Sequence, residues 1–454
     1  MRGNYLISLF LAKAIKLGLN ITKLSGGTSI IGKIVLKLCP DFLSHTNKYI
    51  KTKINVTGTN GKTTTSGLIS HLLKKSGNSV INNALGANMI QGVVNTIAVD
   101  LNPLKKYDYS VIESDEAFLE VIYDKFEADY LVVTNLFRDQ LDRYGELATT
   151  KKFIQNSIDK KPDITLILNA DDPLVASFTG GSKHIFYGVE EVNYEDNLKP
   201  SESHTEEAFN CPCGKPLNYD KKFYAQQGHY SCDCGYKRPE PKYKAKVTLY
   251  KDHSVLEING EVFELPLVGL FNAYNALGAI SLCKELGIKT QEIQKNIKTF
   301  KVAFGRSEVK FLNGKRTLIQ LIKNPIGANE VLKTVDKDST LLIVINDNYA
   351  DGRDVSWLWD AEFEVLNPSP QPSPTRGEGD IFHKEIVVSG TRANDMALRL
   401  KYAGVDTNKI KVISDIEKAV DYVGKSADNN ITILPTYTAL LKLDKMKCLK
   451  RVMG

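Results

Sequence analysis

The segment NVTGTNGKTTTS, close to the N-terminus, has the residue types of a phosphate-binding loop. Gly58 and Gly61 have no side chains, so their neighbouring backbone N–H groups can approach phosphate oxygens, and Lys62 offers a positive charge to the β- and γ-phosphates. Thr63 or Thr64 can present a hydroxyl to Mg²⁺ at the start of a helix. Only two residues separate the glycines, whereas the common P-loop has four. The pattern predicts a shortened nucleotide-binding loop made of Gly58, Thr59, Asn60, Gly61, Lys62, Thr63 and Thr64.

An acidic cluster, VIESDEAFL, follows a second strand-like run and contains Glu113, Asp115 and Glu116. A carboxylate at the end of such a strand can hold magnesium or order its waters. The alternative is a solvated acidic turn. The presence of Lys62 in the preceding loop favours the magnesium interpretation.

Two further polar segments come directly after strand-like runs. LNADDP contains Asn169, Asp171 and Asp172, which are suited to hydrogen-bonding a base or a ribose. TNLFRDQLDRYGE packs several polar side chains into a few positions, among them Asn135 and Gln140. Each segment is a weak signal alone, and their order along the chain is the stronger one.

Four of the seven cysteines form two close pairs, CPCG and CDCG. Four thiolates can satisfy tetrahedral Zn²⁺, and a glycine after each pair fits the turn of a zinc ribbon, here inserted at about 205–245. One residue separates the cysteines of each pair, although two are usual, and the alternative is two reduced surface pairs. We expect a structural zinc site with the ligands Cys211, Cys213, Cys232 and Cys234.

The elements that must position these residues alternate between short β-branched runs and helical patterns. Such alternation predicts an α/β fold with a parallel sheet, whose strands hold the site at their carboxyl ends. A second alternating series predicts a separate Rossmann-like α/β domain, interrupted by a proline-rich surface insertion at 367–380. The expected organisation is an N-terminal helical segment at 1–48, an ATP-binding domain at 49–310 and a C-terminal domain at 311–454.

The length of the chain indicates how many domains it has, and its charge bears on nucleic-acid binding. A chain of 454 residues predicts two or three domains, and a formal charge of +6 without a long basic run gives little support to nucleic-acid binding. The first helical pattern, NYLISLFLAKAIKLGL, contains Lys13 and Lys16 and is too short to span a bilayer, so we expect an amphipathic helix packed on the protein, with loose membrane contact as the alternative. Paired cysteines of this kind indicate a reducing compartment and a metal site rather than a disulfide framework.

The ordered series TGTNGKTTT, ESDEAFL, TNLFRDQLDRYGE, LNADDP, GLFNAYNALGA and GRSE resembles the central domain of the Mur ligases, the ATP-dependent enzymes of peptidoglycan precursor synthesis. The shortened loop is the form found in that family. The resemblance implies that Lys62 and Thr63 bind ATP phosphates and magnesium, and that Glu113 is a magnesium ligand. It further implies nucleotide contacts for Asn272 and Asn275, and a domain-junction position near ATP for Arg306.

One departure from the family concerns its second metal site. Gln140 and Tyr144 stand where many Mur ligases have histidine, and the family's carbamylated lysine has no secure counterpart, with Lys152 the nearest candidate. The second metal site is therefore expected to differ.

The C-terminal segments KNPIGANEVL, NDNYADGRDVSW, GTRANDMALRLKYAGV and LPTYTALLKL resemble one branch of the family, the synthetase subunits of glutamine-dependent lipid II amidating enzymes. The resemblance implies amidation of the α-carboxyl of D-glutamate in the lipid II stem peptide, at the cytoplasmic face of the membrane. It implies a heterodimer with a GatD-type glutaminase. It also implies that Asp354 orients the catalytic histidine of that glutaminase across the interface.

The sequence alone offers another interpretation of Asp354, as the N-cap of the helix that follows it. None of Cys39, Cys283 and Cys448 lies in the strand-to-helix elbow of a nucleophile, so glutamine hydrolysis is expected from another subunit. Two other functions stay open at this point. One is a Mur or folylpolyglutamate-type ligase that joins an amino acid to a carboxylate, and the other is a nucleotide-gated protein whose zinc ribbon binds nucleic acid.

Overall fold

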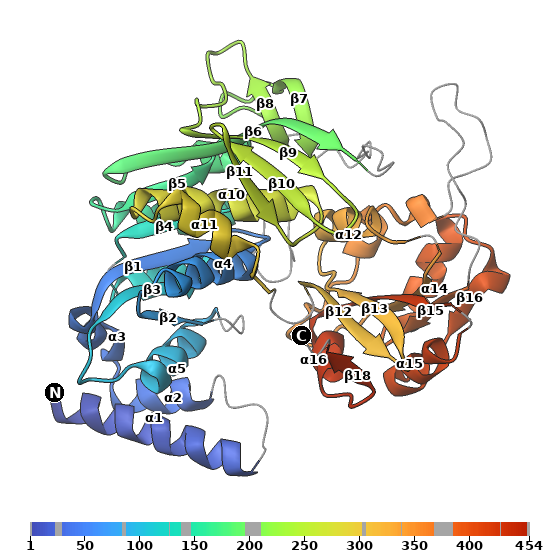
Figure 1. Cartoon of the computed structure of the whole chain (residues 1–454), viewed down its shortest axis with the longest axis horizontal. Coiled ribbons are helices and arrows are strands. Elements are labelled where there is room, and N and C mark those ends of the chain that lie inside the picture. The colour runs from blue at the N-terminus through green and yellow to red at the C-terminus, as the bar shows by residue number, and fades with distance from the viewer. Residues whose placement is uncertain are drawn as a thin grey trace. The chain divides into compact units, whose positions relative to one another are not determined.

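The computed structural model describes residues 2–22, 30–83, 88–126, 128–137, 147–195, 210–301, 306–336, 338–366, 385–426 and 428–451. The chain divides into two compact units (Figure 1). The first contains the described residues up to Lys301, and the second contains those from Arg306 onward. The proline-rich segment 367–380 lies outside the described residues.

The first unit is built on a nine-stranded sheet that is mostly parallel. From one edge to the other its strands are β2 (Val80–Asn82), β3 (Tyr107–Glu113), β1 (Ile50–Thr57), β4 (Tyr130–Val133), β5 (Thr165–Asn169), β6 (Lys183–Tyr194), β9 (Tyr243–Leu249), β10 (Ser254–Ile258) and β11 (Glu261–Leu265). Neighbours from β2 to β9 run parallel, and the last two pairs are antiparallel. The α/β fold with a parallel sheet, predicted from the alternating sequence patterns, is therefore confirmed.

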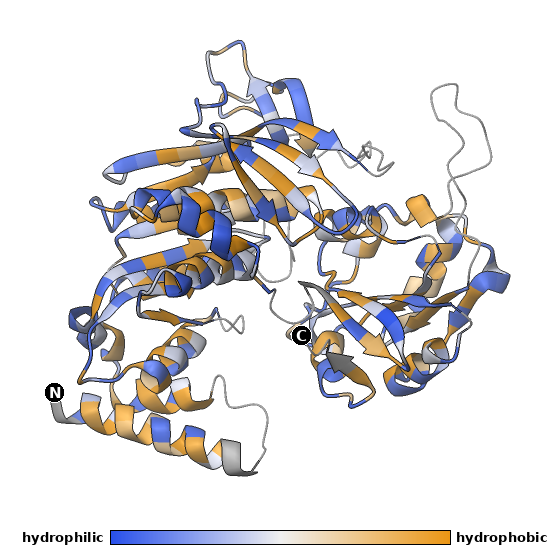
Figure 2. Cartoon of the chain, in the orientation of Figure 1, coloured by the Kyte–Doolittle hydropathy of each residue, from blue (hydrophilic) through white to orange (hydrophobic). Residues whose placement is uncertain are grey.

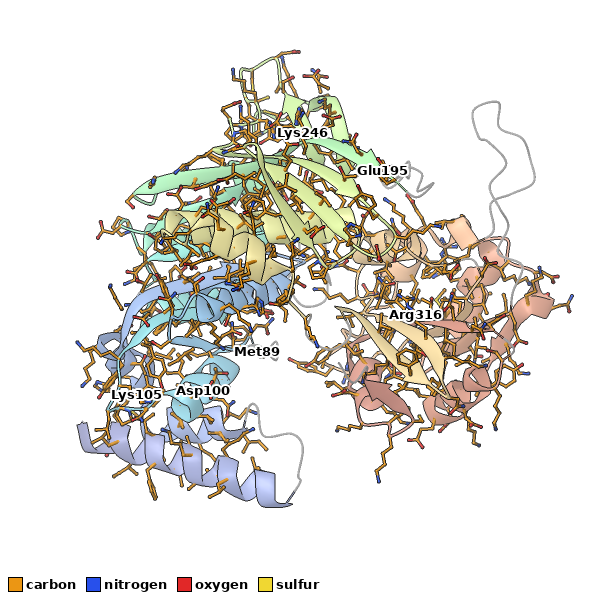
Figure 3. The ribbon with its side chains drawn as sticks, viewed as in Figure 1. Met89, Asp100, Lys105, Glu195, Lys246 and Arg316 are labelled. Atoms are coloured by element: carbon orange, nitrogen blue, oxygen red, sulfur yellow. The ribbon has the colours of Figure 1, made fainter. Side chains whose placement is uncertain are left out.

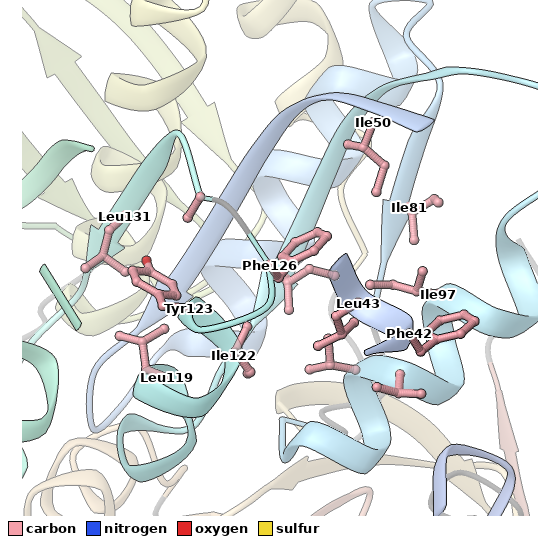
Figure 4. Packing of buried hydrophobic residues seen from close by; sticks show 14 of the residues in the cluster. Phe42, Leu43, Ile50, Ile81, Ile97, Leu119, Ile122, Tyr123, Phe126 and Leu131 are labelled. Atoms are coloured by element: carbon pink, nitrogen blue, oxygen red, sulfur yellow. The ribbon is translucent and has the colours of Figure 1, made fainter. Parts of the chain in front are cut away.

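Helices cover both faces of this sheet, which is why the central strands are apolar on both sides. One face packs against α4 (Lys62–Lys75), α10 (Leu270–Glu285) and α11 (Thr290–Ile297). The other packs against α5 (Ile90–Asp100), α6 (Glu116–Tyr123) and α8 (Leu147–Asp159), together with the N-terminal helices α1 (Arg2–Thr22), α2 (Ile30–Leu38) and α3 (Phe42–Thr46). Figure 4 shows this second core, in which Phe42, Leu43 and Ile97 of the helices lie near Ile50 and Ile81 of the strands.

A two-stranded hairpin, β7 (Asn218–Tyr224) and β8 (Gln227–Ser231), is inserted between β6 and β9. It lies within the segment that the sequence marks as an insertion. Because β6 and β9 are adjacent parallel strands, the chain needs a crossover between them, and the hairpin is part of that crossover.

The second unit has a seven-stranded mixed sheet. In order its strands are β16 (Ile410–Val412), β15 (Ile386–Ser389), β14 (Thr340–Val344), β17 (Asn430–Pro435), β13 (Lys315–Gln320), β12 (Arg306–Leu312) and β18 (Leu449–Arg451). The first five are parallel, and β12 is antiparallel to both of its neighbours. Separate apolar cores lie against α12 (Pro325–Leu332), α13 (Trp357–Asp360) and α14 (Ala393–Tyr402), and against α15 (Ile416–Gly424) and α16 (Tyr437–Asp444).

Among the residues that the structure describes, none of the helices combines the length and the apolar character needed to cross a bilayer. The longest, α1, packs on α2 and α5 with one side only. The sequence prediction of a helix packed on the protein agrees with this arrangement.

Candidate active site

The shortened glycine-rich loop joins β1 to α4 and has two residues in the left-handed region of backbone conformation. Gly58 has φ +121° and Gly61, the N-cap of α4, has φ +85°. A Cβ added to Gly61 would lie 1.9 Å from Oδ1 of Asn275, and one added to Gly58 would lie 2.4 Å from Oγ1 of Thr134. Glycine is therefore required at both positions by conformation and by space.

The end of β4 holds the loop in this conformation. The backbone N–H of Thr59 donates to the carbonyl of Asn135 at 2.9 Å, and that of Asn60 donates to the Asn135 side chain at 2.8 Å. Thr134 Oγ1 donates to the Asn60 carbonyl at 2.7 Å. Since β1 and β4 are parallel neighbours, their carboxyl ends lie at the same edge of the sheet, where the prediction located the site.

Lys62 is buried at the first position of α4, and its amine is held by three oxygens. Nζ donates to Glu116 Oε1 at 2.8 Å, to the Gly58 carbonyl at 2.5 Å and to the Thr59 carbonyl at 3.3 Å. Burial opposes the charge of Lys62, but the nearby carboxylates of Glu116, Asp115 and Glu113 raise its pKa above the ordinary value. The site therefore keeps a positive charge at the start of a helix, where an anion is also favoured by the helix dipole.

Beside it, Thr63 and Glu113 bring a hydroxyl and a carboxylate together. Thr63 Oγ1 donates to Glu113 Oε2 at 2.7 Å, and Asn88 Nδ2 lies 3.4 Å from the other carboxylate oxygen. Asn83 fixes the backbone of Glu113 through two hydrogen bonds of 2.8 Å. Oxygen ligands of this kind suit Mg²⁺, so the donor set fits the predicted metal.

The other two members of the acidic cluster have structural contacts. Asp115 is the N-cap of α6 and accepts a hydrogen bond from the Ala117 N–H. Glu116 forms the buried ion pair with Lys62, and burial raises its pKa in spite of that pairing. The sequence placed Glu116 in the acidic cluster but did not identify it as the partner of Lys62, because the spacing of three carboxylates does not say which one turns inward.

Helix α10 brings its asparagines towards the loop from far along the chain. Asn275 Oδ1 lies against Gly61 and is 3.4 Å from Thr65 Oγ1 of α4. Asn272 is buried one turn earlier and donates to the Val268 carbonyl at 2.8 Å. Asn275 therefore contacts the loop directly, whereas Asn272 bonds to Val268, just before the first turn of its own helix.

Asn169, Asp171 and Asp172 are fully buried at the end of β5, and their described contacts are internal to the protein. Asn169 donates to the Thr134 carbonyl at 3.2 Å. Asp171 accepts hydrogen bonds from Arg238 Nε at 2.6 Å, the Tyr274 hydroxyl at 2.7 Å and the Val189 N–H at 2.7 Å. Their predicted contacts with a base or ribose stay predictions.

Asp172 caps the short helix α9 (Pro173–Ala176) and binds the hairpin region as well. It accepts from the N–H groups of Leu174 and Leu136 and from Gln226 Nε2, at 3.0, 2.9 and 3.1 Å. Burial raises the pKa of Asp172 to about 6 in spite of these hydrogen bonds. Together with the Asp171–Arg238 ion pair, this contact fastens the inserted hairpin to the end of the sheet.

The four paired cysteines come together at the hairpin. Their Sγ atoms all lie within 4.8 Å of one another, with Cys211 and Cys234 at 3.3 Å and Cys213 and Cys232 at 3.7 Å. Tetrahedral Zn–S bonds of ~2.3 Å place sulfurs about 3.8 Å apart, which this cluster approximates. A hydrogen bond from the Tyr236 N–H lowers the pKa of Cys234 to about 7, which favours the thiolate form that binds zinc.

The two cysteine turns have the same backbone pattern. The N–H of Gly214 donates to the Cys211 carbonyl, and the N–H of Gly235 donates to the Cys232 carbonyl, with φ +87° and +93° at the two glycines. The tight turn after each pair lets a spacing of one residue bring all four sulfurs together.

In the second unit, Asp354 lies in the segment between β14 and α13. Its Oδ1 accepts from the Ser356 N–H at 2.8 Å, while the N-cap of α13 is Ser356 itself. Asp354 thus forms a turn before the helix, and its side chain is only partly buried. The alternative of a direct helix N-cap is therefore not the one observed.

Asp351, three residues earlier, anchors this segment. Its buried carboxylate accepts hydrogen bonds from the Thr438 N–H at 2.6 Å and Thr438 Oγ1 at 2.5 Å, at the start of α16, and from the Asn348 N–H at 3.2 Å. The sequence suggested only a turn former, because nothing local shows a contact made nearly 90 residues away.

Some predicted residues lie outside the described part of the chain. These are the segment 138–146, which includes Gln140 and Tyr144, and the side chain of Arg306. Lys152 is described and is exposed on α8. Its role in a second metal site stays a prediction.

Comparison with known proteins agrees with this site and fold. Residues 56–283 match the Mur ligase middle domain. Among solved structures, the chain is similar to a pseudomurein peptide ligase type C from Methanothermus fervidus, with a TM-score of 0.66 and 24% identity, covering 91% of this chain and 83% of the other. It is also similar to MurF from Acinetobacter baumannii, with a TM-score of 0.62 and 14% identity, covering 91% and 80%. The fold and the loop define a ligase of the Mur type.

The second unit identifies the branch. Residues 321–440 match the MurT ligase C-terminal family. The MurT subunit of lipid II isoglutaminyl synthase (glutamine-hydrolyzing) from Staphylococcus aureus strain COL is 37% identical, and 91% of each chain is covered. The corresponding subunit of Streptococcus pneumoniae strain R6 is 33% identical, with 95% of each chain covered. The chain belongs to the MurT family.

Proposed function

We propose that this chain is the ATP-dependent synthetase subunit of a lipid II isoglutaminyl synthase. It amidates the α-carboxyl of D-glutamate in the lipid II stem peptide and so forms D-isoglutamine, at the cytoplasmic face of the membrane. The observation that carries the proposal is the combination, in one chain, of a Mur ligase middle domain with a MurT C-terminal domain, over nearly the whole length of named MurT subunits.

The first step is activation of the carboxylate. A carboxylate oxygen is a poor leaving group, and transfer of the ATP γ-phosphoryl to it forms an acyl phosphate. Lys62 would neutralise charge on the transferring oxygens, and the loop N–H groups beside Gly58 and Gly61 would orient them. Thr63 and Glu113 would hold the magnesium ion, which supplies further charge neutralisation when it is bound.

The second step forms the amide. Ammonia attacks the acyl carbon, a C–N bond forms, the C–O bond to phosphate breaks, and a proton leaves the nitrogen. Ammonia in neutral water is mostly ammonium, so a GatD-type glutaminase subunit that releases it beside the acyl phosphate is chemically useful. In this heterodimer Asp354 would orient the catalytic histidine of the partner. The partial exposure of Asp354 supports that role.

The finer structural assignments belong to the same proposal. The cysteine hairpin is a zinc ribbon with a structural metal ion, supported by the clustering of the four thiols. The C-terminal domain is Rossmann-like, supported by its five adjacent parallel strands. We propose nucleotide contacts for Asn169, Asp171, Asn272, Asn275 and Arg306, and a domain boundary at 48/49. The predicted boundary at 310/311 falls inside β12, a strand of the second sheet, so we place that boundary before Arg306.

The test is the nitrogen donor that supports ADP release from a lipid II substrate. We expect glutamine to work only with the glutaminase subunit present, and ammonium salts to work without it. If a free amino acid is joined to the carboxylate and ammonia is not, the chain is a Mur-type amino acid ligase and the proposal is wrong. Lys62→Ala is expected to eliminate ADP release with either nitrogen source.

A second variant separates the two active centres. Asp354→Asn is expected to abolish glutamine-driven amidation and to leave ammonium-driven amidation largely intact, because only the glutaminase triad is damaged. Asp360→Asn, in the following helix, is the matched control and is expected to keep both activities. Loss of both activities in Asp354→Asn would rule out the proposed role.

A further inference from the structure

The N-terminal helix α1 is apolar on two opposite sides, although only one of them packs against the protein. Tyr5, Leu9 and Ala12 are buried against the first unit. The opposite side carries Leu6, Ile7, Phe10 and Leu17, with exposed fractions of 51%, 59%, 76% and 62%. In Figure 2 the orange colour of apolar residues extends along most of α1. A surface helix of a soluble domain normally has a polar face at this position.

The spacing shows that these residues form one stripe. Leu6, Phe10 and Leu17 follow one another at intervals of four and seven residues, so they lie within about 40° of one another around the helix, and Ile7 lies beside them. α2, which packs beside α1, adds exposed Ile30 and Leu38. We call this set of six residues, Leu6, Ile7, Phe10, Leu17, Ile30 and Leu38, the N-terminal apolar surface.

The charge carried by the N-terminal helices themselves has one sign. The first 40 positions contain six basic residues and no acidic one, so the rest of the chain is formally neutral. Lys16, Lys33 and Lys37 are exposed on the two helices, and Lys13 is half-buried. Asp100, at the end of α5 (Figure 3), lies in the field of Lys13 and Lys16 and offsets part of their charge.

We propose that the N-terminal apolar surface docks on an anionic lipid bilayer and lies in its headgroup region without crossing it. An apolar stripe flanked by lysines is the arrangement of an interfacial helix. Anionic headgroups complement the lysines, and the acyl boundary accepts Phe10 and Leu17. This deepens the proposed function, because a synthetase that rests on the membrane would meet a lipid-linked substrate there. The docking itself needs no substrate.

The test is sedimentation of the full-length chain with vesicles that contain no substrate. Binding to phosphatidylglycerol-containing vesicles is expected to exceed binding to phosphatidylcholine vesicles, and to weaken at high salt. The double variant Phe10→Ser/Leu17→Ser is expected to lose at least about tenfold in vesicle affinity, because two apolar side chains no longer leave water. Lys16→Gln and Lys33→Gln are each expected to lose up to about fivefold.

Val262→Ser is the matched control, because Val262 is similarly exposed, at 52%, but lies on β11. It is expected to bind vesicles like the unmodified chain. An unchanged thermal unfolding midpoint and an unchanged ATP affinity would show that the double variant is folded. These readouts also separate this proposal from the proposed function, since vesicle binding does not depend on amidation.

Three results would overturn the proposal. The unmodified chain could fail to bind anionic vesicles, or it could bind neutral vesicles equally well at low salt. The double variant could also leave vesicle binding unchanged while turning a dimer into a monomer in analytical ultracentrifugation, which would assign the apolar surface to a second copy of the chain.

Discussion

Single atoms decide the shape of the nucleotide loop. Gly61 lies against Asn275 so closely that a methyl group has no place, and this contact joins the loop to a helix that the sequence places far away. The sequence predicted glycine for approach to phosphate. It could not show that the second glycine also makes room for an asparagine, because that contact depends on how α10 packs on α4.

Replacement of this glycine tests the contact. We expect Gly61→Ala to reduce ATP affinity at least about tenfold, because the left-handed backbone and the clash with Asn275 both force the loop to move. Gly77→Ala is the control, since Gly77 has φ +86° and a Cβ added there would meet no atom within 4 Å. It is expected to lose about 1 kcal/mol of stability and to keep its ATP affinity, which isothermal titration calorimetry measures.

Asp172 gives a prediction about pH. Its pKa is raised from 3.8 to about 6 by burial, so the folded chain binds a proton more tightly than the unfolded chain. The unfolding free energy of the native chain should therefore fall as the pH rises from 4.5 to 7, by about 2 kcal/mol from this group. Asp172→Asn cannot ionise, and its stability should show a correspondingly weaker decline in urea unfolding at the same pH values. Parallel pH profiles for the two proteins would contradict the buried-carboxylate interpretation.

At the scale of elements, strand ends converge on one edge of the first sheet. The predicted parallel strands made of short β-branched runs are confirmed as β1, β3, β4 and β5, because apolar β-branched runs between turn residues leave few alternatives. The contacts of Asp171 and Asp172 with the hairpin were not predictable from the sequence. Their positions after a strand suggested contacts with a nucleotide, which stay a prediction, and the observed contacts with Arg238 and Gln226 come from an insertion.

The cysteine hairpin gives a prediction at this scale. We expect one zinc ion per chain by elemental analysis, and a large loss of zinc in Cys211→Ser and Cys232→Ser, since three thiolates bind more weakly than four. Cys448→Ser is the control, because Cys448 is exposed and lies outside the cluster. Equal zinc content in all three variants would show that the metal is bound elsewhere.

At the scale of the whole molecule, the chain consists of two units with separate cores. Composition and alternating patterns predicted an α/β fold in both halves. They could not predict the antiparallel additions at the sheet edges, β12 and β18, because edge pairing depends on which strands remain unpartnered after the parallel core has formed.

Separate cores imply separate responses to ligand. We expect calorimetry of the full chain to show two unfolding transitions. Saturating ATP with Mg²⁺ should raise mainly the one that belongs to the first unit, which carries all the proposed nucleotide contacts except that of Arg306. At a hundredfold excess over Kd the gain is about 2.7 kcal/mol, or a shift of roughly 5–10 °C for a domain of this size. Lys62→Ala should remove the shift. An equal shift of both transitions would show that the two units unfold together or share the nucleotide site equally.

The position of the cysteine hairpin has one further consequence. It occupies the path from β6 to its parallel neighbour β9, a path that chains usually complete with a helix of a dozen or more residues. Removal of the whole connection, residues 195–242, would leave no chain to return from the end of β6 to the start of β9, so the sheet would lose its last three strands. A helical linker of that length in place of the hairpin should instead preserve the sheet and make its folding independent of zinc.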